Sequence, residues 1–353
     1  MQPVLVTDDH RFTQHLERMP HMESSRRIAA VREILANDRL QGKLQIVPPR
    51  PATVDELSMI HTQEYIEKVA ASAGKALTSF DMDTQATEKS YDIARLGAGA
   101  VFSLLDEICK GTAERAFAFI RPPGHHAEAD KAMGFCLFNN VALGARYLQR
   151  RYGLKRILIA DIDAHHGNGT QRAFYNDKDV LYFSAHQFPA YPGSGNFGEI
   201  GEGAGEGYTI NVPLGNGCGD RDFSRILYFL LAPLAREFKP EIILVSCGFD
   251  LYENDRLCKM RVTPEGYALI TFFLLDMAQR LCNGRILFVM EGGYSLRGIR
   301  ECGLRTIQEM CDIPTLTAKV IRRVTEADPS KLSFLKKVFE VHKKYWTSLG
   351  GRF

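Results

Sequence analysis

The feature that most constrains the fold of this chain is a series of short apolar runs, each followed by a polar cluster. Five such runs are predicted to be strands: residues 117–120, 157–160, 180–183, 242–245 and 286–290. Continuous apolar runs of this length are typical of strands buried on both faces. Helical patterns lie between most of them, at residues 140–152, 222–238 and 264–281. This alternation predicts an α/β fold with one open, mostly parallel sheet and helices on both faces.

The remaining segments predict further elements. Strands are expected at residues 4–7 and 44–47, and helices at 26–36, 91–109 and 330–346. Ser24 or Ser25 would cap the helix at 26–36, and Thr53 with Glu56 forms a capping box for another helix. The tail helix is expected to be amphipathic, with its lysines on a solvated face: Lys336, Lys337, Lys343 and Lys344.

The length of 353 residues is compatible with two domains, but α/β folds of this size are often single. We expect one domain over residues 1–353, with 313–353 as a C-terminal helical extension packed on it. A net charge of +2 gives no reason to expect a nucleic-acid or membrane partner. No run approaches the roughly 18 apolar residues of a membrane helix.

The eight cysteines form no C-x-x-C pair, and Cys136 and Cys247 lie in apolar runs. They are therefore predicted to be reduced core thiols rather than disulfides. The apolar run near the N-terminus is too short for a signal peptide. These observations predict a cytoplasmic protein.

Polar residues after the predicted strands suggest a metal site. Asp163 and His165 follow the strand at 157–160, and Asp250 follows the strand at 242–245. In open α/β sheets, ligands bind just beyond the carboxyl ends of the strands. Two carboxylates and a neutral imidazole suit a zinc ion that keeps an open position for water. An alternative is a loop with capped polar groups.

The adjacent pair His125 and His126 supplies candidates for a general base. The alternative without a catalytic role is a histidine pair that forms hydrogen bonds within a loop. Asp161 would orient one imidazole and Asn168 the other. Because an Asp partner stabilises imidazolium more than an Asn partner does, we predict that the histidine paired with Asn168 stays neutral and acts as the base.

Three aromatic residues are further candidates. Gly292 and Gly293 would let the backbone bring the Tyr294 phenol near the metal, where it would hold an oxyanion. Gly134 with Phe135, and Tyr191, would line an apolar channel, although each aromatic ring is also compatible with an ordinary core position. Oxygen atoms after two strands would also suit a monovalent cation, but spacing alone does not decide this: Asp161, Asp163, His165, Ser184 and Ala185.

Taken together, these motifs resemble the zinc-dependent histone deacetylase family, which includes bacterial deacetylase-like amidohydrolases and acetylpolyamine amidohydrolases. Five segments carry the resemblance: RPPGHHA at 121–127, GFC at 134–136, DIDAHHGNGT at 161–170, GFD at 248–250 and EGGY at 291–294. It covers roughly residues 1–312. Asn168, the Ala127-Glu128 continuation and Phe249-Asp250 are similar to class II enzymes.

The resemblance implies the arginase–deacetylase fold and hydrolysis of an acylated amine to a carboxylate and a free amine. It implies zinc on Asp163, His165 and Asp250. It also implies roles for the other candidates: His126 as principal general base and acid, His125 as an electrostatic partner, Tyr294 as the oxyanion contact, Phe135 and Tyr191 as channel walls, and Asp81 or Asp83 as a rim carboxylate. Two potassium sites are implied as well. One would lie at Asp161, Asp163, His165, Ser184 and Ala185, the other at the carbonyls of Phe174, Asp177, Val180 and Tyr208.

Three features bear on activity and specificity, and two of them depart from the family pattern. Tyr294 is retained, unlike in weakly active class IIa enzymes, so we expect genuine deacylase activity. Leu257 stands where polyamine-selective relatives have an acidic gatekeeper, which favours acyl-lysine because a buried cation would lack its partner charge. The first loop has the sequence PHME at residues 20–23 instead of the usual proline-rich form, which leaves the rim and the substrate width open.

The expected substrate is an acyl-lysine peptide or protein, or a small acylated amine, and a homo-oligomer is compatible with the sequence. Three other functions compete with this prediction. The first is acetylpolyamine hydrolysis within the same family. The second is a binuclear manganese ureohydrolase, which is disfavoured because Asn168 and Tyr252 stand where a second metal would need further carboxylates. The third is a silent acyl-lysine-binding module, which would predict loss of Tyr294 or of a metal ligand.

Overall fold

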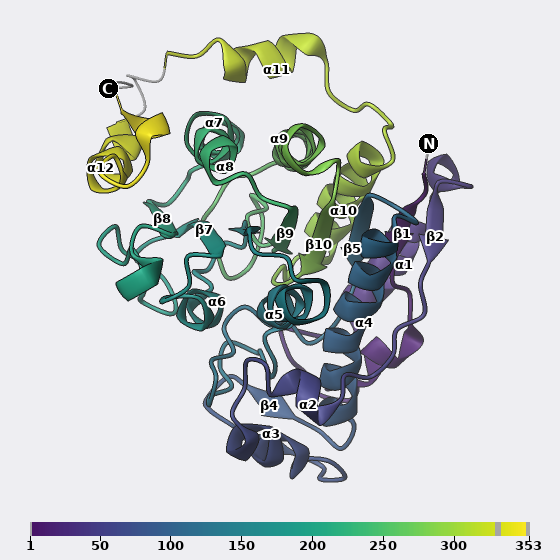
Figure 1. Cartoon of the computed structure of the whole chain (residues 1–353). Helices are drawn as coiled ribbons and strands as arrows, with labels where there is room; N and C mark the ends of the chain where they lie inside the picture. Colours follow the sequence, from purple (N-terminus) through teal and green to yellow (C-terminus); the bar gives the residue numbers. More distant parts are fainter. Residues whose placement is uncertain (1, 329–332, 351–353) are drawn as a thin grey trace.

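An eight-stranded parallel sheet lies at the centre of the computed structural model, which describes residues 2–328 and 333–350 (Figure 1). The strand order is β2-β1-β5-β10-β9-β6-β7-β8, and every neighbouring pair is parallel. The strands are β1 (Val4–Val6), β2 (Leu44–Ile46), β5 (Arg115–Ala118), β6 (Ile157–Asp161), β7 (Val180–Gln187), β8 (Thr209–Leu214), β9 (Ile242–Cys247) and β10 (Ile286–Met290). The predicted α/β architecture is confirmed.

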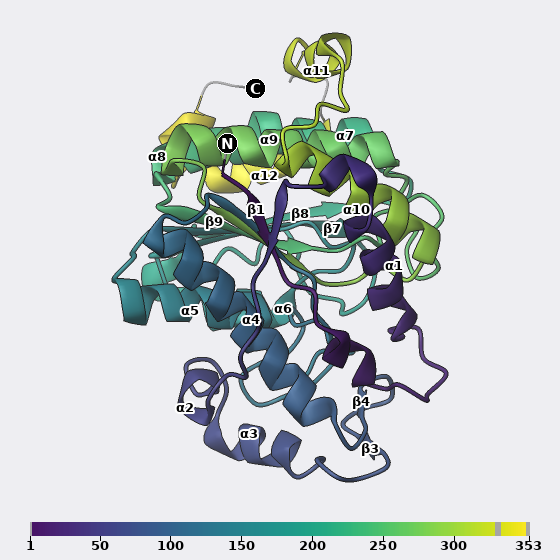
Figure 2. The ribbon, with the colours of Figure 1, turned by 90° about the vertical axis from the view of Figure 1, so that its right-hand side faces the viewer.

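Both faces of the sheet are buried, which explains why its central strands are continuously apolar. Along β9, Ile243 and Val245 enter one hydrophobic core while Ile242 and Leu244 enter the other. The first core lies under α1 (Arg26–Leu35), α7 (Asp220–Ile226), α8 (Ala232–Phe238), α9 (Pro264–Cys282) and α10 (Leu296–Met310). The second lies under α4 (Ser90–Lys110) and α5 (Asn140–Tyr152) (Figure 2). Each fully buried aliphatic or phenylalanine side chain stabilises the fold by about 1.5–3 kcal/mol.

The N-terminal region adds shorter elements below the sheet. These are α2 (Val54–Leu57), α3 (Gln63–Ala70) and an antiparallel pair, β3 (Thr78–Ser79) with β4 (Gln85–Ala86). The predicted capping box forms at α2, where Thr53 accepts from the Glu56 amide and Glu56 accepts from the Thr53 amide. The predicted cap of α1 is wrong for Ser25, because its side chain makes no capping hydrogen bond.

Some elements differ from the sequence prediction. β5 ends at Ala118, so Phe119 and Ile120 of the predicted strand lie beyond it. β8 was not predicted, because Asn211 and Pro213 interrupt its apolar pattern; proline is tolerated there since β8 is an edge strand. Three helices were also missed: α6 (Asn168–Ala173), α10 and α11 (Ala318–Thr325).

The helix predicted at 222–238 begins at Asp220 and contains a π-helical turn over Leu227–Leu231 between α7 and α8. In this turn the Ala232 amide donates to the Leu227 carbonyl. Pro233 follows directly and has no amide hydrogen, so the ordinary helical bond is missing at this point. A local change of hydrogen-bond register is therefore a reasonable response of the helix.

The C-terminal segment lies beside β8. The predicted tail helix is present as α12 (Ser333–His342), and residues 330–332 of that prediction lie outside the described residues. α12 ends at His342, so Lys343 and Lys344 lie beyond it rather than on the helix as predicted. All four lysines are exposed, as predicted. Beyond α12 the Trp346 indole is buried and donates a 2.8 Å hydrogen bond to the Gly207 carbonyl. All eight cysteines are free thiols, and within the described residues no helix is long and apolar enough to cross a membrane.

Candidate active site

The ends of four neighbouring strands bring the predicted polar residues together. Asp163 and His165 follow β6, Asp250 follows β9, the pair His125 and His126 follows β5, and Tyr294 follows β10. β5, β10, β9 and β6 are adjacent in the sheet, so these side chains meet at its carboxyl edge. All of them except His165 are buried, and His165 is partly exposed.

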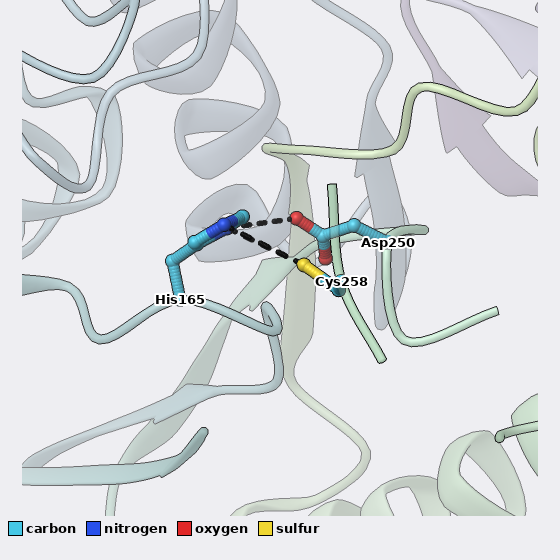
Figure 3. A group of neighbouring side chains, drawn as sticks. All are labelled: His165, Asp250 and Cys258. Carbon is cyan, nitrogen blue, oxygen red and sulfur yellow. Dashed lines mark hydrogen bonds and ion pairs between the residues drawn. The ribbon is translucent and has the colours of Figure 1, made fainter. Parts of the chain in front are cut away.

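His165 is the centre of a group of possible metal donors. Its Nδ1 lies 3.1 Å from Asp163 Oδ1 and 3.1 Å from Asp250 Oδ2. Cys258 Sγ lies 3.5 Å from Nε2 and 4.0 Å from Nδ1 of the same ring (Figure 3). The ligand atoms of His165, Asp250 and Cys258 all lie within 4.8 Å of one another. Cys258 was not predicted, because it lies in an irregular loop with no metal-binding spacing.

The charges of this group fit a bound cation. Burial, followed by the neighbouring Asp163, raises the pKa of Asp250 to about 7. Burial opposes ionisation of Asp163 too, but His125 and His165 hold the pKa of its carboxyl below the ordinary value. Burial disfavours the charged form of His165, yet its hydrogen bonds to Asp163 and Asp250 raise its pKa well above 6.5. Two buried carboxylates thus compete for positive charge, and an imidazole with two carboxylates is a donor set that zinc accepts.

Backbone groups hold both carboxylates in place. The Gly292 amide donates to Asp163 Oδ2 at 2.8 Å, and the Ala164 amide donates to Asp250 Oδ1 at 2.9 Å. A Cβ atom on Gly292 would stand 2.3 Å from Asp250 Oδ2, so only glycine permits this approach. Gly292 of the EGGY motif therefore helps to position the carboxylates of Asp163 and Asp250, in addition to the motif's supplying Tyr294.

The two histidines have different partners. His125 Nδ1 lies 3.1 Å from Asp161 Oδ2, and His126 Nδ1 lies 2.9 Å from Asn168 Oδ1. Burial opposes protonation of His125, but Asp163 and Asp161 raise its pKa to about 10. Burial, with the nearby His125 and His165, holds the pKa of His126 well below 6.5. At neutral pH the geometry therefore favours a charged His125 beside a neutral His126.

Glu291 fixes the backbone of the histidine pair, a role the sequence did not suggest. One carboxylate oxygen accepts from the amides of Gly124 at 2.7 Å and His125 at 3.1 Å, and the other accepts from the Ser246 hydroxyl at 3.0 Å. Burial raises its pKa to about 7, although His125 opposes this. The sequence marks Glu291 only as part of a motif, because the partners of its carboxylate lie on two other segments, at residues 124–125 and at Ser246.

Aromatic rings surround the approach to His126. The Tyr191 ring lies edge-on to His126 with centroids 5.1 Å apart, and Phe135 lies edge-on to Tyr294 at 5.6 Å. Gly134 has φ +56, and a Cβ atom there would stand 2.4 Å from His126 Cδ2. Tyr191 is 40% exposed and Leu257 is 42% exposed, so both lie at the surface.

The two rim candidates differ in their contacts. The Asp81 carboxylate accepts from the amides of Asp83 at 3.0 Å and Thr84 at 2.6 Å, so it stabilises its own turn. Asp83 accepts from the Thr84 hydroxyl at 2.9 Å, and that hydroxyl accepts from the Phe135 amide at 3.1 Å. Of the two, Asp83 is therefore the carboxylate that is linked, through Thr84, to Phe135.

The residues proposed for potassium lie near the same strands. Asp161 is opposite Ser184 in the register of β6 and β7, and its Oδ1 accepts from the Asp163 amide at 3.2 Å. Ser184 Oγ lies 2.9 Å from His186 Nδ1, and Ala185 is buried beside it. In the second set, Phe174 and Val180 are buried, the Phe174 carbonyl accepts from the Asp177 amide, and the Tyr208 carbonyl accepts from the Tyr182 amide.

The fold and this site define a class of protein: a parallel α/β sheet carrying a hydrolytic site at its carboxyl edge, the arginase–deacetylase fold. A histone deacetylase domain model matches residues 21–310. The crystal structure of the HDA15 HD domain matches with a TM-score of 0.88 and 35% identity, covering 99% of this chain and 97% of that one. The chain therefore belongs to the histone deacetylase family and is a hydrolytic deacetylase.

Relatives from distant organisms agree with this assignment. The chain is 37% identical to Histone deacetylase 10, chloroplastic, of Oryza sativa over 85% of this chain and 71% of that protein. It is 34% identical to a probable deacetylase of Archaeoglobus fulgidus over 95% of this chain and 96% of that protein. Histone deacetylase 15 of Arabidopsis thaliana is longer, and the match spans 62% of its length. Family membership implies a metal cofactor.

Proposed function

We propose that this protein is a zinc-dependent lysine deacylase that hydrolyses the acyl-amide bond of acyl-lysine side chains. One observation carries the proposal: the His126 imidazole lies beside both the His165 ring, with centroids 5.9 Å apart, and the Tyr191 ring, at 5.1 Å. A base, a cation site and an apolar approach are the parts that hydrolysis of a linear amide needs.

Asp163, His165 and Asp250 would hold the zinc ion. When bound, zinc supplies Lewis acidity toward the amide carbonyl and lowers the pKa of a water molecule. Cys258 is the weaker candidate for a ligand. Its sulfur is farther from His165 Nδ1 than either carboxylate is, and burial followed by Asp250 raises the pKa of its thiol to about 12.

The proton transfers fall to His126. Its Nδ1 is occupied by Asn168, so Nε2 is the nitrogen free to accept a proton from the attacking water and to return it to the leaving lysine amine. His125, held by Asp161, keeps its positive charge and stabilises the negative charge that develops in the site. Breakage of the C–N bond then releases the carboxylate and the amine.

Tyr294 would donate its phenolic hydrogen to the oxyanion. Burial, and then Asp250, raise the pKa of Tyr294 well above 10, so the phenol stays protonated at neutral pH. Its ring contacts Phe135, and the Arg27 guanidinium lies 5.5 Å from the ring centroid. These contacts limit the positions that the hydroxyl can adopt, which is the preorganisation that an oxyanion contact requires.

For the substrate, Phe135 and Tyr191 would enclose the lysine methylenes and Asp83 would accept a backbone amide of the peptide. The uncharged Leu257 favours this substrate over a polyamine. Acetylpolyamine hydrolysis is a second candidate, because Asp83 near the channel mouth also suits a distal ammonium group. We further propose potassium at the two oxygen sets described above, and a cytoplasmic location.

The test is hydrolysis by the zinc-loaded enzyme of an acetyl-lysine peptide, compared with acetylputrescine and acetylcadaverine. Dominant peptide turnover supports the proposal, and dominant polyamine turnover replaces it with the second candidate. Tyr294→Phe is the control, because it leaves the channel intact and should lower kcat by about 10²–10³ with little change in KM. If peptide and acetylpolyamine hydrolysis both continued after the metal was removed, the zinc mechanism would be refuted.

A further inference from the structure

A carboxylate outside the metal cluster, Glu128, is joined to His126 by a chain of hydrogen bonds. His126 Nδ1 lies 2.9 Å from Asn168 Oδ1, and Asn168 Nδ2 donates to Glu128 Oε1 at 2.7 Å. Glu128 Oε2 in turn accepts from Arg172 at 2.5 Å. We propose that Glu128 is a positioning residue that fixes the orientation of the Asn168 amide and, through it, the tautomer of His126. This inference rests on the proposed role of His126 as the base.

The argument begins with the ambiguity of an amide side chain. Asparagine presents an acceptor on one side and a donor on the other, and both sides have nearly the same shape. If the amide of Asn168 turned over, its nitrogen would face His126 Nδ1 and its oxygen would face Glu128. Nothing in the shape of Asn168 itself prevents this reversal, so its neighbours must decide the orientation.

The neighbours of the Asn168 nitrogen are acceptors. Besides Glu128, they are the His126 backbone carbonyl at 3.3 Å and the Met133 sulfur at 3.3 Å. Neither an ionised carboxylate nor a carbonyl can donate a hydrogen bond. A reversed amide would therefore set oxygen against oxygen at a buried position. Of the three acceptors, Glu128 makes the shortest contact and is the one that carries a charge, so it contributes most to this preference.

The consequence reaches the reactive nitrogen. With its oxygen toward His126, Asn168 can only accept, so the ring hydrogen of neutral His126 must be on Nδ1. Nε2 then has a lone pair, which a base requires. With the amide reversed, the hydrogen would be on Nε2 and the ring could not take a proton from water there. Glu128 thus selects the active tautomer of His126 through two successive hydrogen bonds, without contacting the substrate.

The local structure makes this inference testable by mutation. The backbone of Glu128 is held independently of its side chain, because its amide donates to the Lys131 carbonyl and its carbonyl accepts from His61. The Glu128 side chain is 13% exposed and the Arg172 side chain 70% exposed, so Glu128→Gln, which keeps the size of the side chain, removes its charge without changing the packed volume. Asp130 is an exposed acidic residue nearby and supplies a matched control for the loss of one charge.

The experiment compares Glu128→Gln, Asp130→Asn and the unmodified zinc-loaded protein, labelled with ¹⁵N in its histidine rings. His126 is assigned by the signals that disappear in His126→Ala. We expect the Nδ1–H form in the unmodified protein and in Asp130→Asn. Glutamine can offer either oxygen or nitrogen to Asn168, so Glu128→Gln should show both tautomers, with KM unchanged and kcat reduced in proportion to the Nε2–H population, about twofold if the two tautomers are equally populated.

A second variant tests the same logic in reverse. An aspartate at position 168 accepts through either oxygen, so in Asn168→Asp the neutral form of His126 should keep its hydrogen on Nδ1 whether or not Glu128→Gln is added. An unaltered His126 tautomer in Glu128→Gln, or a tautomer that responds to Glu128→Gln even when residue 168 is aspartate, overturns the inference. The tautomer is read without turnover, whereas the role of His126 as the base fails if His126→Ala keeps its kcat, so the two failures are distinguishable.

Discussion

Replacement of Gly134 by alanine tests the link between backbone geometry and the position of the base. Gly134 has φ +56, and an added Cβ atom would stand 2.4 Å from His126 Cδ2 and 3.1 Å from Tyr191 Cε1. An ordinary contact begins near 3.4 Å, so the imidazole or the loop has to move by about 1 Å. A displacement of that size at a reacting group costs on the order of 10²-fold in rate.

The same substitution also lowers stability. A residue with a Cβ atom costs about 1–2 kcal/mol in the left-handed region, and overpacking against the ring adds about 1–3 kcal/mol. Gly153 is the matched control because it has φ +67 and nothing within 4 Å of an added Cβ atom. Gly153→Ala should therefore show the backbone cost alone, while its activity stays unchanged.

The assay is kcat/KM on an acetyl-lysine peptide together with the free energy of unfolding in urea, for both alanine variants. We expect the two variants to share a loss of stability and only Gly134→Ala to lose about 10²-fold in kcat/KM. Equal activity in the two variants would refute the reasoning, because it would mean that the position of His126 does not depend on this contact.

Three further predictions concern charge. Asn168→Asp should raise the pKa of His126, which must be neutral to act, so the acidic limb of the pH–rate profile should move to higher pH; an unshifted limb would contradict this. Asp163→Ala should lose the zinc measured by elemental analysis, whereas Cys258→Ser should keep about one equivalent; loss in both variants would make the thiol a ligand. Glu23→Gln should cost about 3–5 kcal/mol in urea unfolding, because it leaves two buried arginines without a counter-charge, and unchanged stability would contradict this. Burial opposes ionisation of Glu23, but Arg121 and Arg27 together lower its pKa, so its stabilising effect is present above the ordinary pKa of glutamate and is lost as the pH falls from there through the lowered pKa of the folded state.

The strand ends could be predicted from sequence because a buried strand leaves an unmistakable apolar run. Asp163, His165 and Asp250 follow such runs, and the parallel topology then requires them to meet. The edge strand β8 was not predicted, because Asn211 and Pro213 leave it without a continuous apolar run. An edge strand tolerates such residues because it pairs with a neighbour on one side only. The π-helical turn was not predicted either, because Pro233 indicates only that a helical hydrogen bond is missing, not how the backbone responds.

Pairing across the site could not be predicted. The sequence offered Asp161 and Asn168 to two adjacent histidines without saying which would bind which, and it offered Asp81 and Asp83 equally for the rim. The role of Glu291 could not be predicted at all, because the residues that its carboxylate contacts are separated from it by up to 167 residues in the sequence. In each case the missing information is the relative position of segments from different strands, which local pattern does not contain.

The contrast between the two histidines shows what the partner of each contributes. Both rings are buried and adjacent, so burial alone would keep both neutral. Asp161 brings a full negative charge to the ring of His125, which favours the charged form. Asn168 gives His126 a hydrogen bond of similar length without that charge, and the carboxylate of Glu128 lies one residue farther away. An amide between the base and a carboxylate therefore transmits orientation but little of the charge. For a group that must be both correctly aimed and unprotonated at rest, an intervening asparagine meets both requirements, whereas a direct carboxylate meets only the first.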